Sequence, residues 1–234
     1  MGPSSGSDGR STPNEMVSII DGGWKEGELA SLIKTARSEL RDRNPEILAS
    51  LSGTRFDPLS REFFVTVFGR GYFVTYPEFV AYEEGVHGRR ESTPWIQCLL
   101  LHYFRSSNGT NLANQWISFR ELPSGMFYQH AFQTYTGDRI IRAFGSDLER
   151  LKTAALAIGC ATEAIGDFGV SIRALPRVPV ALAYWLGDDD LPPTAKVLFD
   201  ASARDYLPTD ALAVVGGRFC SLILGAAGIL LSNA

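Results

Sequence analysis

The 234-residue sequence predicts an α+β fold, in which helices pack against a central antiparallel or mixed sheet within a single domain. Two observations support this class. Helical and strand patterns are grouped along the chain in the order αα, ββ, α, β, αα, βββ, α, whereas a parallel α/β sheet would need regular alternation. The composition is 45% hydrophobic and 11% aromatic, which is enough to bury one full core. The sequence has no visible internal repeat.

The chain is expected to begin with two helices and a β-hairpin. Apolar residues recur at three- and four-residue steps over Trp24–Asp42, as in an amphipathic helix. Pro45 suits the first turn of a second helix, which Gly53 would end. The segments Phe63–Phe68 and Tyr72–Tyr76 are rich in β-branched and aromatic residues and flank a glycine-containing turn. They predict a hairpin.

A polar loop is expected next, over Glu83–Glu91, before a helix that Thr93 caps and Pro94 opens. This helix, Trp95–Phe104, is apolar nearly all round and is therefore expected in the middle of the core. His102 lies within it. A histidine in such a setting is more often a hydrogen-bonded structural residue than a ligand or base, so a functional role requires that His102 face a cavity.

The middle of the chain predicts one strand followed by short helices. Alternation over Trp116–Leu122 is typical of a strand. The aromatic-rich segment Met126–Phe144 suits one or two short helices. Ser146 and Glu149 form the pattern of a capping box, which predicts a helix that continues through Ile158.

The last third of the domain is expected to contribute most of the sheet. A short strand is predicted over Asp167–Leu175. The uncharged run Val178–Leu186 is expected to be the central strand, because it can be covered on both faces. After an acidic turn, Lys196–Asp200 returns as a further strand, and a helix opens at Pro208.

The two ends of the chain are expected to lie outside the domain. Residues 1–16 are rich in Gly, Ser and Pro and form a disordered tail rather than a signal peptide. Residues 17–217 form the domain, and residues 218–234 form an apolar C-terminal segment. Its apolar run is only about 13 residues long, whereas a membrane span needs about 20. We therefore expect a buried helix or a protein contact there, and no membrane span.

Charge and cysteine content argue against several functional classes. The formal net charge of -4 gives no basic footprint, so no nucleic-acid partner is expected. Cys98, Cys160 and Cys220 lie far apart, without a CxxC motif, which predicts reduced core cysteines in a cytoplasmic protein and no intrinsic iron–sulfur cluster. GxSxG, HExxH and GxGxxG motifs are also missing, and this favours binding over catalysis.

An acidic turn supplies the candidate metal ligands. Asp188, Asp189 and Asp190 are consecutive, and Asp200 ends the strand that follows. Carboxylates are hard oxygen ligands that suit Mg²⁺ or Ca²⁺, so Asp188, Asp190 and Asp200 are the predicted set. The alternative is a solvated turn. It is favoured because consecutive aspartates cannot all point the same way and because the spacing fits no calcium loop.

Four segments resemble, in order and spacing, the bacterial and archaeal domain-of-unknown-function family 3786. They are LLLHYF (Leu99–Phe104), QWISFRELPSGMFY (Gln115–Tyr128), LPRVPVALAYWLGDDDLP (Leu175–Pro192) and VLFDASARDYLPTD (Val197–Asp210). The resemblance covers about Trp24 to Val215 and implies no particular activity. Relatives look to be encoded near, or fused to, iron–sulfur and corrinoid proteins of anaerobic one-carbon metabolism.

Three functional hypotheses follow. The first is a soluble binding or accessory protein that holds or hands over a corrinoid or another tetrapyrrole-like cofactor. The DxHxxG and CxxCH motifs are missing, so binding would need an aromatic pocket. Its candidate residues are His102, Tyr103, Arg120, Tyr128 and His130. The second is a non-catalytic interaction subunit that contacts a protein partner through the C-terminal apolar segment. The third is a metal-assisted enzyme that uses the Asp188, Asp190 and Asp200 carboxylates.

Overall fold

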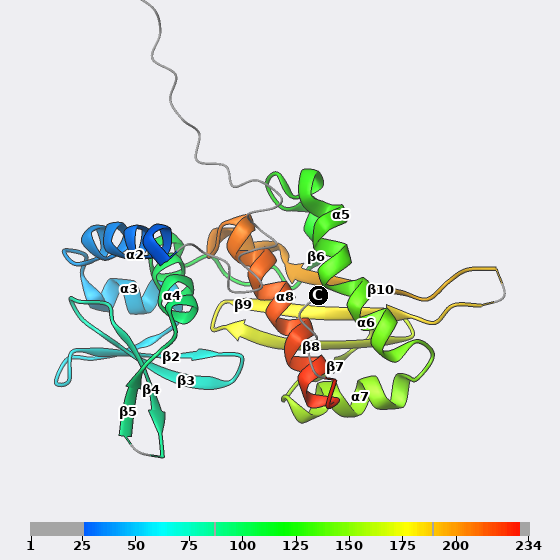
Figure 1. Ribbon diagram of the computed structural model, residues 1–234. Coiled ribbons are helices and arrows are strands. Elements are labelled where there is room, and N and C mark those ends of the chain that lie inside the picture. Colours follow the sequence, from blue (N-terminus) through cyan, green and yellow to red (C-terminus); the bar gives the residue numbers. More distant parts are fainter. Residues whose placement is uncertain (1–25, 87, 189, 230–234) are drawn as a thin grey trace, which may run out of the picture.

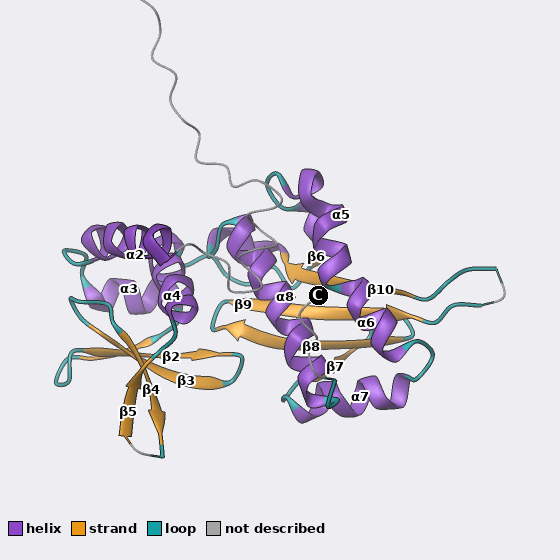
Figure 2. Cartoon of the chain, viewed as in Figure 1, coloured by secondary structure: helices purple, strands orange, loops and turns teal. Residues whose placement is uncertain are grey.

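The computed structural model describes residues 26–86, 88–188 and 190–229. The predicted tail over residues 1–16, the start of the first helix at Trp24, Asp189 of the acidic turn and residues 230–234 lie outside this range. Within it the α+β class is confirmed, with antiparallel pairing throughout the named strands. The strands are divided between two five-stranded sheets, each with its own helices (Figures 1 and 2).

The first sheet is a meander in which sequence order equals spatial order, β1-β2-β3-β4-β5. The elements of this half are α2 (Glu26–Leu40), α3 (Pro45–Ser52), β1 (Arg55–Asp57), β2 (Glu62–Val67), β3 (Arg70–Thr75), β4 (Ala81–Gly85), β5 (Gly88–Glu91) and α4 (Pro94–Ser106). In β2, Phe63 and Val65 are buried, whereas Phe64 between them is half-buried on the other face. Phe63 contacts Phe104 of α4, with ring centroids 4.7 Å apart.

Several of the predictions for this half are confirmed, and one is wrong. The second helix begins at Pro45, and Gly53 ends it in the left-handed conformation at φ 68°. The predicted hairpin is β2–β3. The expected polar loop over Glu83–Glu91 is instead the hairpin β4–β5. Its strands carry opposite charges directly across from each other, as in the Glu83 and Arg90 pair, and such pairs stabilise a strand that has no apolar alternation.

The second sheet has the spatial order β6-β10-β9-β8-β7. The elements of this half are β6 (Trp116–Ser118), the 3₁₀ turn η1 (Phe119–Glu121), α5 (Gly125–Tyr135), α6 (Gly137–Phe144), α7 (Leu148–Ala157), β7 (Ala161–Glu163), β8 (Phe168–Leu175), β9 (Val178–Trp185), β10 (Thr194–Asp200), η2 (Ala201–Asp205) and α8 (Thr209–Ala226). The uncharged strand β9 is central, as predicted. Its residues from Val180 to Tyr184 are fully buried.

Two element starts or ends in this half differ from the prediction. The strand predicted over Trp116–Leu122 stops at Ser118, because Ser118 and Glu121 form a capping box that starts η1. The capping box predicted at Ser146 is not the cap of α7. Asp147 occupies that position, and its carboxylate accepts a hydrogen bond from the Arg150 amide. The short strand β7 was not predicted.

The C-terminal helix α8 extends the predicted helix without a break to Ala226. Its apolar side chains Phe219, Cys220, Ile223 and Leu224 are buried, so the apolar C-terminal segment is part of the core as far as this helix reaches. By length and composition alone α8 could cross a bilayer, but half of its 18 residues are buried inside the fold. Core helices of globular proteins have the same property.

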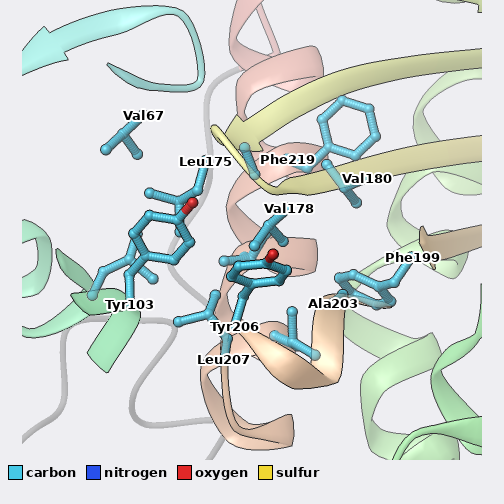
Figure 3. Packing of buried hydrophobic residues seen from close by; sticks show 14 of the residues in the cluster. Val67, Tyr103, Leu175, Val178, Val180, Phe199, Ala203, Tyr206, Leu207 and Phe219 are labelled. Carbon is cyan, nitrogen blue, oxygen red and sulfur yellow. The ribbon is translucent and has the colours of Figure 1, made fainter. Parts of the chain in front are cut away.

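One hydrophobic cluster runs through both halves, in keeping with the predicted single domain. Figure 3 shows its centre, where Tyr103 of α4 lies near Tyr206 of the second half, with ring centroids 6.0 Å apart. The Tyr103 hydroxyl donates to the Ser52 carbonyl and accepts from the Arg177 amide at 3.0 Å. The bond from Arg177 crosses between the two halves, which are therefore joined by a polar contact as well as by packing.

Candidate functional site

A small cavity lies between α4 and α8. Its volume is about 40 Å³. The lining residues are Trp95, Cys98, Leu99 and His102 of α4 and Asp210, Ala211 and Val214 of α8. On each helix they follow steps of three or four residues, so each helix presents one face to the cavity. The cavity is therefore built from two stretches of chain that lie more than a hundred residues apart.

The two helices run in opposite directions along the cavity. Asp210, in the first turn of α8, acts electrostatically on His102 and Cys98. Two turns further along α8, the guanidinium of Arg218 lies over the Trp95 ring, 5.9 Å from its centroid. The His102 end of α4 therefore faces the start of α8, and the Trp95 end faces Arg218.

The rest of α4 explains why this face is turned outward from the core. The buried Gln97 side chain accepts from the Ala81 amide at 3.0 Å and donates to the Ala81 carbonyl at 2.9 Å, which ties the helix to β4. Tyr103 and Phe104 point into the core. Because these contacts hold the other sides of α4 against β4 and the core, the face that carries Cys98 and His102 lies toward α8.

Burial controls the protonation of the cavity's imidazole and thiol. Desolvation lowers the pKa of His102 below its ordinary value, although the Asp210 charge opposes the shift and Arg105 adds to it. Burial raises the pKa of the Cys98 thiol to about 11, and the Asp210 charge raises it further. At neutral pH the cavity therefore presents a neutral imidazole and a protonated thiol.

Asp210 supplies the charge at this end of the cavity. Its Oδ1 accepts from the adjacent Ala211 amide at 2.9 Å. No described residue donates to its other carboxylate oxygen. The arrangement can hydrogen-bond a small polar group and enclose an apolar one, but the protonated Cys98 thiol is a poor nucleophile.

The predicted cofactor-binding residues are not gathered at one place. His102 lines the cavity, as its functional role requires. Tyr103 is fully buried on the other side of α4. Arg120 in η1 and His130 on α5 are exposed, and Tyr128 on α5 is half-buried. The other four therefore lie away from the lining of the His102 cavity.

The three predicted metal ligands are also separated. Asp188 accepts from the Asp190 amide at 3.0 Å and the Leu191 amide at 2.8 Å, so it organises the turn before β10. Asp200 lies at the opposite end of β10. In the part of the chain that the structure describes, no group of three or more His, Cys, Asp or Glu side chains is placed to hold a metal ion.

Asp200 has a structural role instead. It is buried, and its Oδ1 accepts from the Ala113 amide at 2.9 Å and from the Ser202 amide and hydroxyl at 2.9 and 2.6 Å. Burial raises its pKa, but these hydrogen bonds outweigh burial and leave the pKa below its ordinary value. The carboxylate thus ties the end of β10 to the loop before β6.

Sequence reasoning missed Trp95, Cys98 and Asp210 as site residues. The available signal was the spacing of Trp95, Cys98, Leu99 and His102, which places them on one face of a helix. Nothing local indicates that this face meets α8, because that pairing depends on how the two sheets are joined.

A family model described as "Domain of unknown function (DUF3786)" matches residues 44–221. The match includes all of α4 and every lining residue of the cavity. No curated protein and no solved structure matches the chain.

Proposed function

The chain belongs to the DUF3786 family, and from that premise we propose that it is a binding or accessory protein that holds a small ligand between α4 and α8. The observation that carries the proposal is the cavity in which His102, Cys98 and Asp210 meet apolar walls. Ligand sites are typically concave and mostly apolar, with a few convergent polar groups. This cavity has that composition on a small scale.

The chemistry of the cavity favours binding over catalysis. A nucleophilic cysteine needs a lowered pKa and an adjacent base, but burial raises the pKa of the Cys98 thiol to about 11. The neutral imidazole of His102 is suited to accept or donate a hydrogen bond or to bind a metal centre through its lone pair. Neither role requires turnover.

A corrinoid or another tetrapyrrole is the ligand class that the family resemblance implies. His102 offers the correct donor type for axial ligation of a metal-centred ring. The cavity does not fit the ring itself, because about 40 Å³ holds only about three water molecules at roughly 10–15 Å³ each. As it stands, the cavity admits a slender group, and a macrocycle would require α4 and α8 to move apart.

Ligand binding can be tested by filling the cavity. Val214→Trp places a large side chain in the lining, and Leu222→Trp introduces the same residue at a half-buried position of α8 outside it. Native mass spectrometry of anaerobically purified protein, with a thermal-shift fragment screen, should detect ligands of the wild type and Leu222→Trp only. If no ligand distinguishes Val214→Trp from the other two proteins, the proposal fails.

The corrinoid class has a separate test. Adding cobalamin under anaerobic conditions should change the absorption spectrum with the wild type, and His102→Gln should abolish the change because the imidazole ligand is lost. No spectral change with the wild type would exclude axial ligation by His102 and leave smaller ligands as the class to pursue.

A protein contact is the second candidate, favoured by an exposed apolar pair on α5. Met126 is 64% exposed and Phe127 is 81% exposed. This pair is a better docking position than the apolar residues of α8, which lie in the core. Phe127→Ser should leave the thermal unfolding midpoint unchanged. If it also leaves the assembly seen by native mass spectrometry unchanged, the contact does not involve α5.

A further inference from the structure

We infer that the cavity between α4 and α8 binds one thiophilic metal ion, Cu(I), through the sulfur of Cys98 and the imidazole of His102. The inference rests on the proposed ligand-binding function and names the ligand. It is carried by the placement of a sulfur donor and a nitrogen donor one helical turn apart on α4, both in the lining of the same small cavity.

The spacing of the two donors suits a single ion. Cys98 and His102 are four residues apart on α4, so their side chains share one face of the helix, with Cβ atoms about 6 Å apart. The same spacing allows the two histidines of an HExxH helix to hold one metal ion. Of the three cysteines in the chain, only Cys98 has a histidine three or four residues away.

Both donors are available to a ligand. No described residue hydrogen-bonds to the Cys98 thiol or to the His102 imidazole. Asp210, across the cavity, acts electrostatically on both residues, and its negative charge favours a cation at this position. The nearby cation, Arg105, forms an ion pair with Glu39 at 2.7 Å, and this reduces its repulsion of a bound ion.

The size and composition of the cavity select the kind of ion. A volume of about 40 Å³ admits a metal ion. Among the described residues Asp210 does not complete a three-ligand group with Cys98 and His102, whereas Zn²⁺ usually takes three or four protein ligands. Cu(I) can be held by two ligands in a linear arrangement, and thiolate and imidazole are donors that suit copper.

The charge of the bound ion also matches the surroundings. Binding breaks the S–H bond of Cys98, forms an S–Cu bond and releases the proton to solvent, while His102 coordinates through its unprotonated nitrogen. Copper remains Cu(I), so no oxidant or reductant is consumed. The single positive charge cancels that of the thiolate, and a neutral pair can be buried beside Leu99 and Val214 at far lower cost than a lone charge.

The test titrates Cu(I) into the anaerobically purified full chain in competition with bicinchoninate, a chromophoric Cu(I) chelator. The wild type should withdraw one Cu(I) per chain. Copper X-ray absorption should then show one sulfur and one nitrogen neighbour. Loss of a group that only orients a ligand costs about 10- to 100-fold in metal affinity, so Cys98→Ser and His102→Gln, which remove ligands, should each cost at least about 100-fold.

Two matched variants control for adventitious binding. Cys160→Ser removes a thiol of nearly equal exposure outside the cavity lining, and His130→Gln removes an exposed imidazole. Both should retain the affinity of the wild type. Circular dichroism checks that each variant is folded, and His102→Gln tests the site independently of any change in the packing around Cys98.

The outcomes separate this inference from the proposed function. Loss of the bound ion in Cys98→Ser and His102→Gln, but not in the two controls, supports the metal site. If the wild type binds no Cu(I), or if Cys160→Ser weakens binding as much as Cys98→Ser, the metal site is wrong, and ligand binding still stands if another ligand is excluded by Val214→Trp. If neither Cu(I) nor any other ligand binds the wild type, both fail.

Discussion

The two faces of α4 carry adjacent polar residues in opposite situations. Tyr103 faces the core, is fully buried, and uses its hydroxyl both to donate to Ser52 and to accept from Arg177. His102, one residue earlier, faces α8 and lines the cavity. No described residue hydrogen-bonds to its imidazole. On one helix, therefore, the Tyr103 hydroxyl forms its hydrogen bonds within the protein, whereas the adjacent His102 imidazole is available to solvent or to a ligand.

Two aspartates show the same contrast. The carboxylate of Asp200 accepts from Ala113 and Ser202 and joins parts of the fold. Among the described residues, the carboxylate of Asp210 accepts only from the next amide in its own helix. Buried polar groups are normally paired within the protein. Hydrogen bonding within the fold, rather than residue type, is therefore what separates Tyr103 and Asp200 from His102 and Asp210, the residues of the proposed binding site.

The largest effect on stability should come from truncating Tyr103, on the side of α4 that faces the core. Tyr103→Ala removes a fully buried aromatic ring and should lower the free energy of unfolding by about 3–5 kcal/mol. Tyr103→Phe removes only the hydroxyl and leaves the Ser52 carbonyl and the Arg177 amide unpaired, at a cost of about 1–3 kcal/mol. Urea unfolding measures both. Tyr103→Phe with the stability of the wild type would mean that these bonds do not join the two halves.

The second effect compares the two aspartates. Asp200→Ala should lower the free energy of unfolding by about 1–3 kcal/mol at neutral pH, because several donors lose their acceptor. Asp210→Ala should cost less than about 1 kcal/mol, the usual range for an acid near a helix start. Equal losses in chemical denaturation would remove the distinction between them.

The pH dependence of the Asp200 effect has a definite sign. Hydrogen bonds outweigh burial and hold its folded-state pKa below the ordinary value near 3.8. Its contribution is therefore complete above that value and is lost as the pH falls through the lower folded-state pKa. The difference between wild type and Asp200→Ala should shrink in that acidic range.

The sequence predicted whatever depended on local pattern. β-Branched and aromatic composition around a glycine-containing turn predicted β2 and β3, and the uncharged run predicted the central position of β9. The hairpin β4–β5 was missed because charged pairs such as Glu83 and Arg90 stabilise it across strands. The sequence predicted that His102 could have a functional role only if it faced a cavity, and His102 does line one. Asp210 was not predicted, because its position near His102 depends on how α8 packs against α4.

The third effect concerns His102 and is smaller. Desolvation lowers its folded-state pKa below the unfolded value near 6.5, so the unfolded state binds more protons between the two values. Stability should fall as the pH drops below about 6.5, and His102→Gln should reduce that slope. The facing charges are Asp210, which favours protonation, and Arg105, which opposes it. Denaturation of His102→Gln and of the exposed-site control His130→Gln measures the difference, and identical slopes would contradict burial as the cause.

The smallest effect compares Cys98, which lines the cavity, with Cys160, which does not. Their exposed fractions are nearly equal, at 8% and 7%. Burial raises the pKa of Cys98 to about 11 and that of Cys160 to about 12. Each pKa unit changes the thiolate fraction about tenfold, but the less basic thiolate is also intrinsically less nucleophilic, so iodoacetamide should alkylate Cys98 only about threefold faster. Peptide mass spectrometry measures both rates in one sample.

Val214→Trp then tests whether reagent reaches Cys98 through the cavity. The larger side chain should slow alkylation of Cys98 and leave that of Cys160 unchanged, since only the first thiol shares the cavity with Val214. If both rates fall together, reaction requires a wider opening of the fold, and the cavity is not the route. If only Cys98 slows, the cavity face of α4 admits small molecules in the folded protein, as a binding site must.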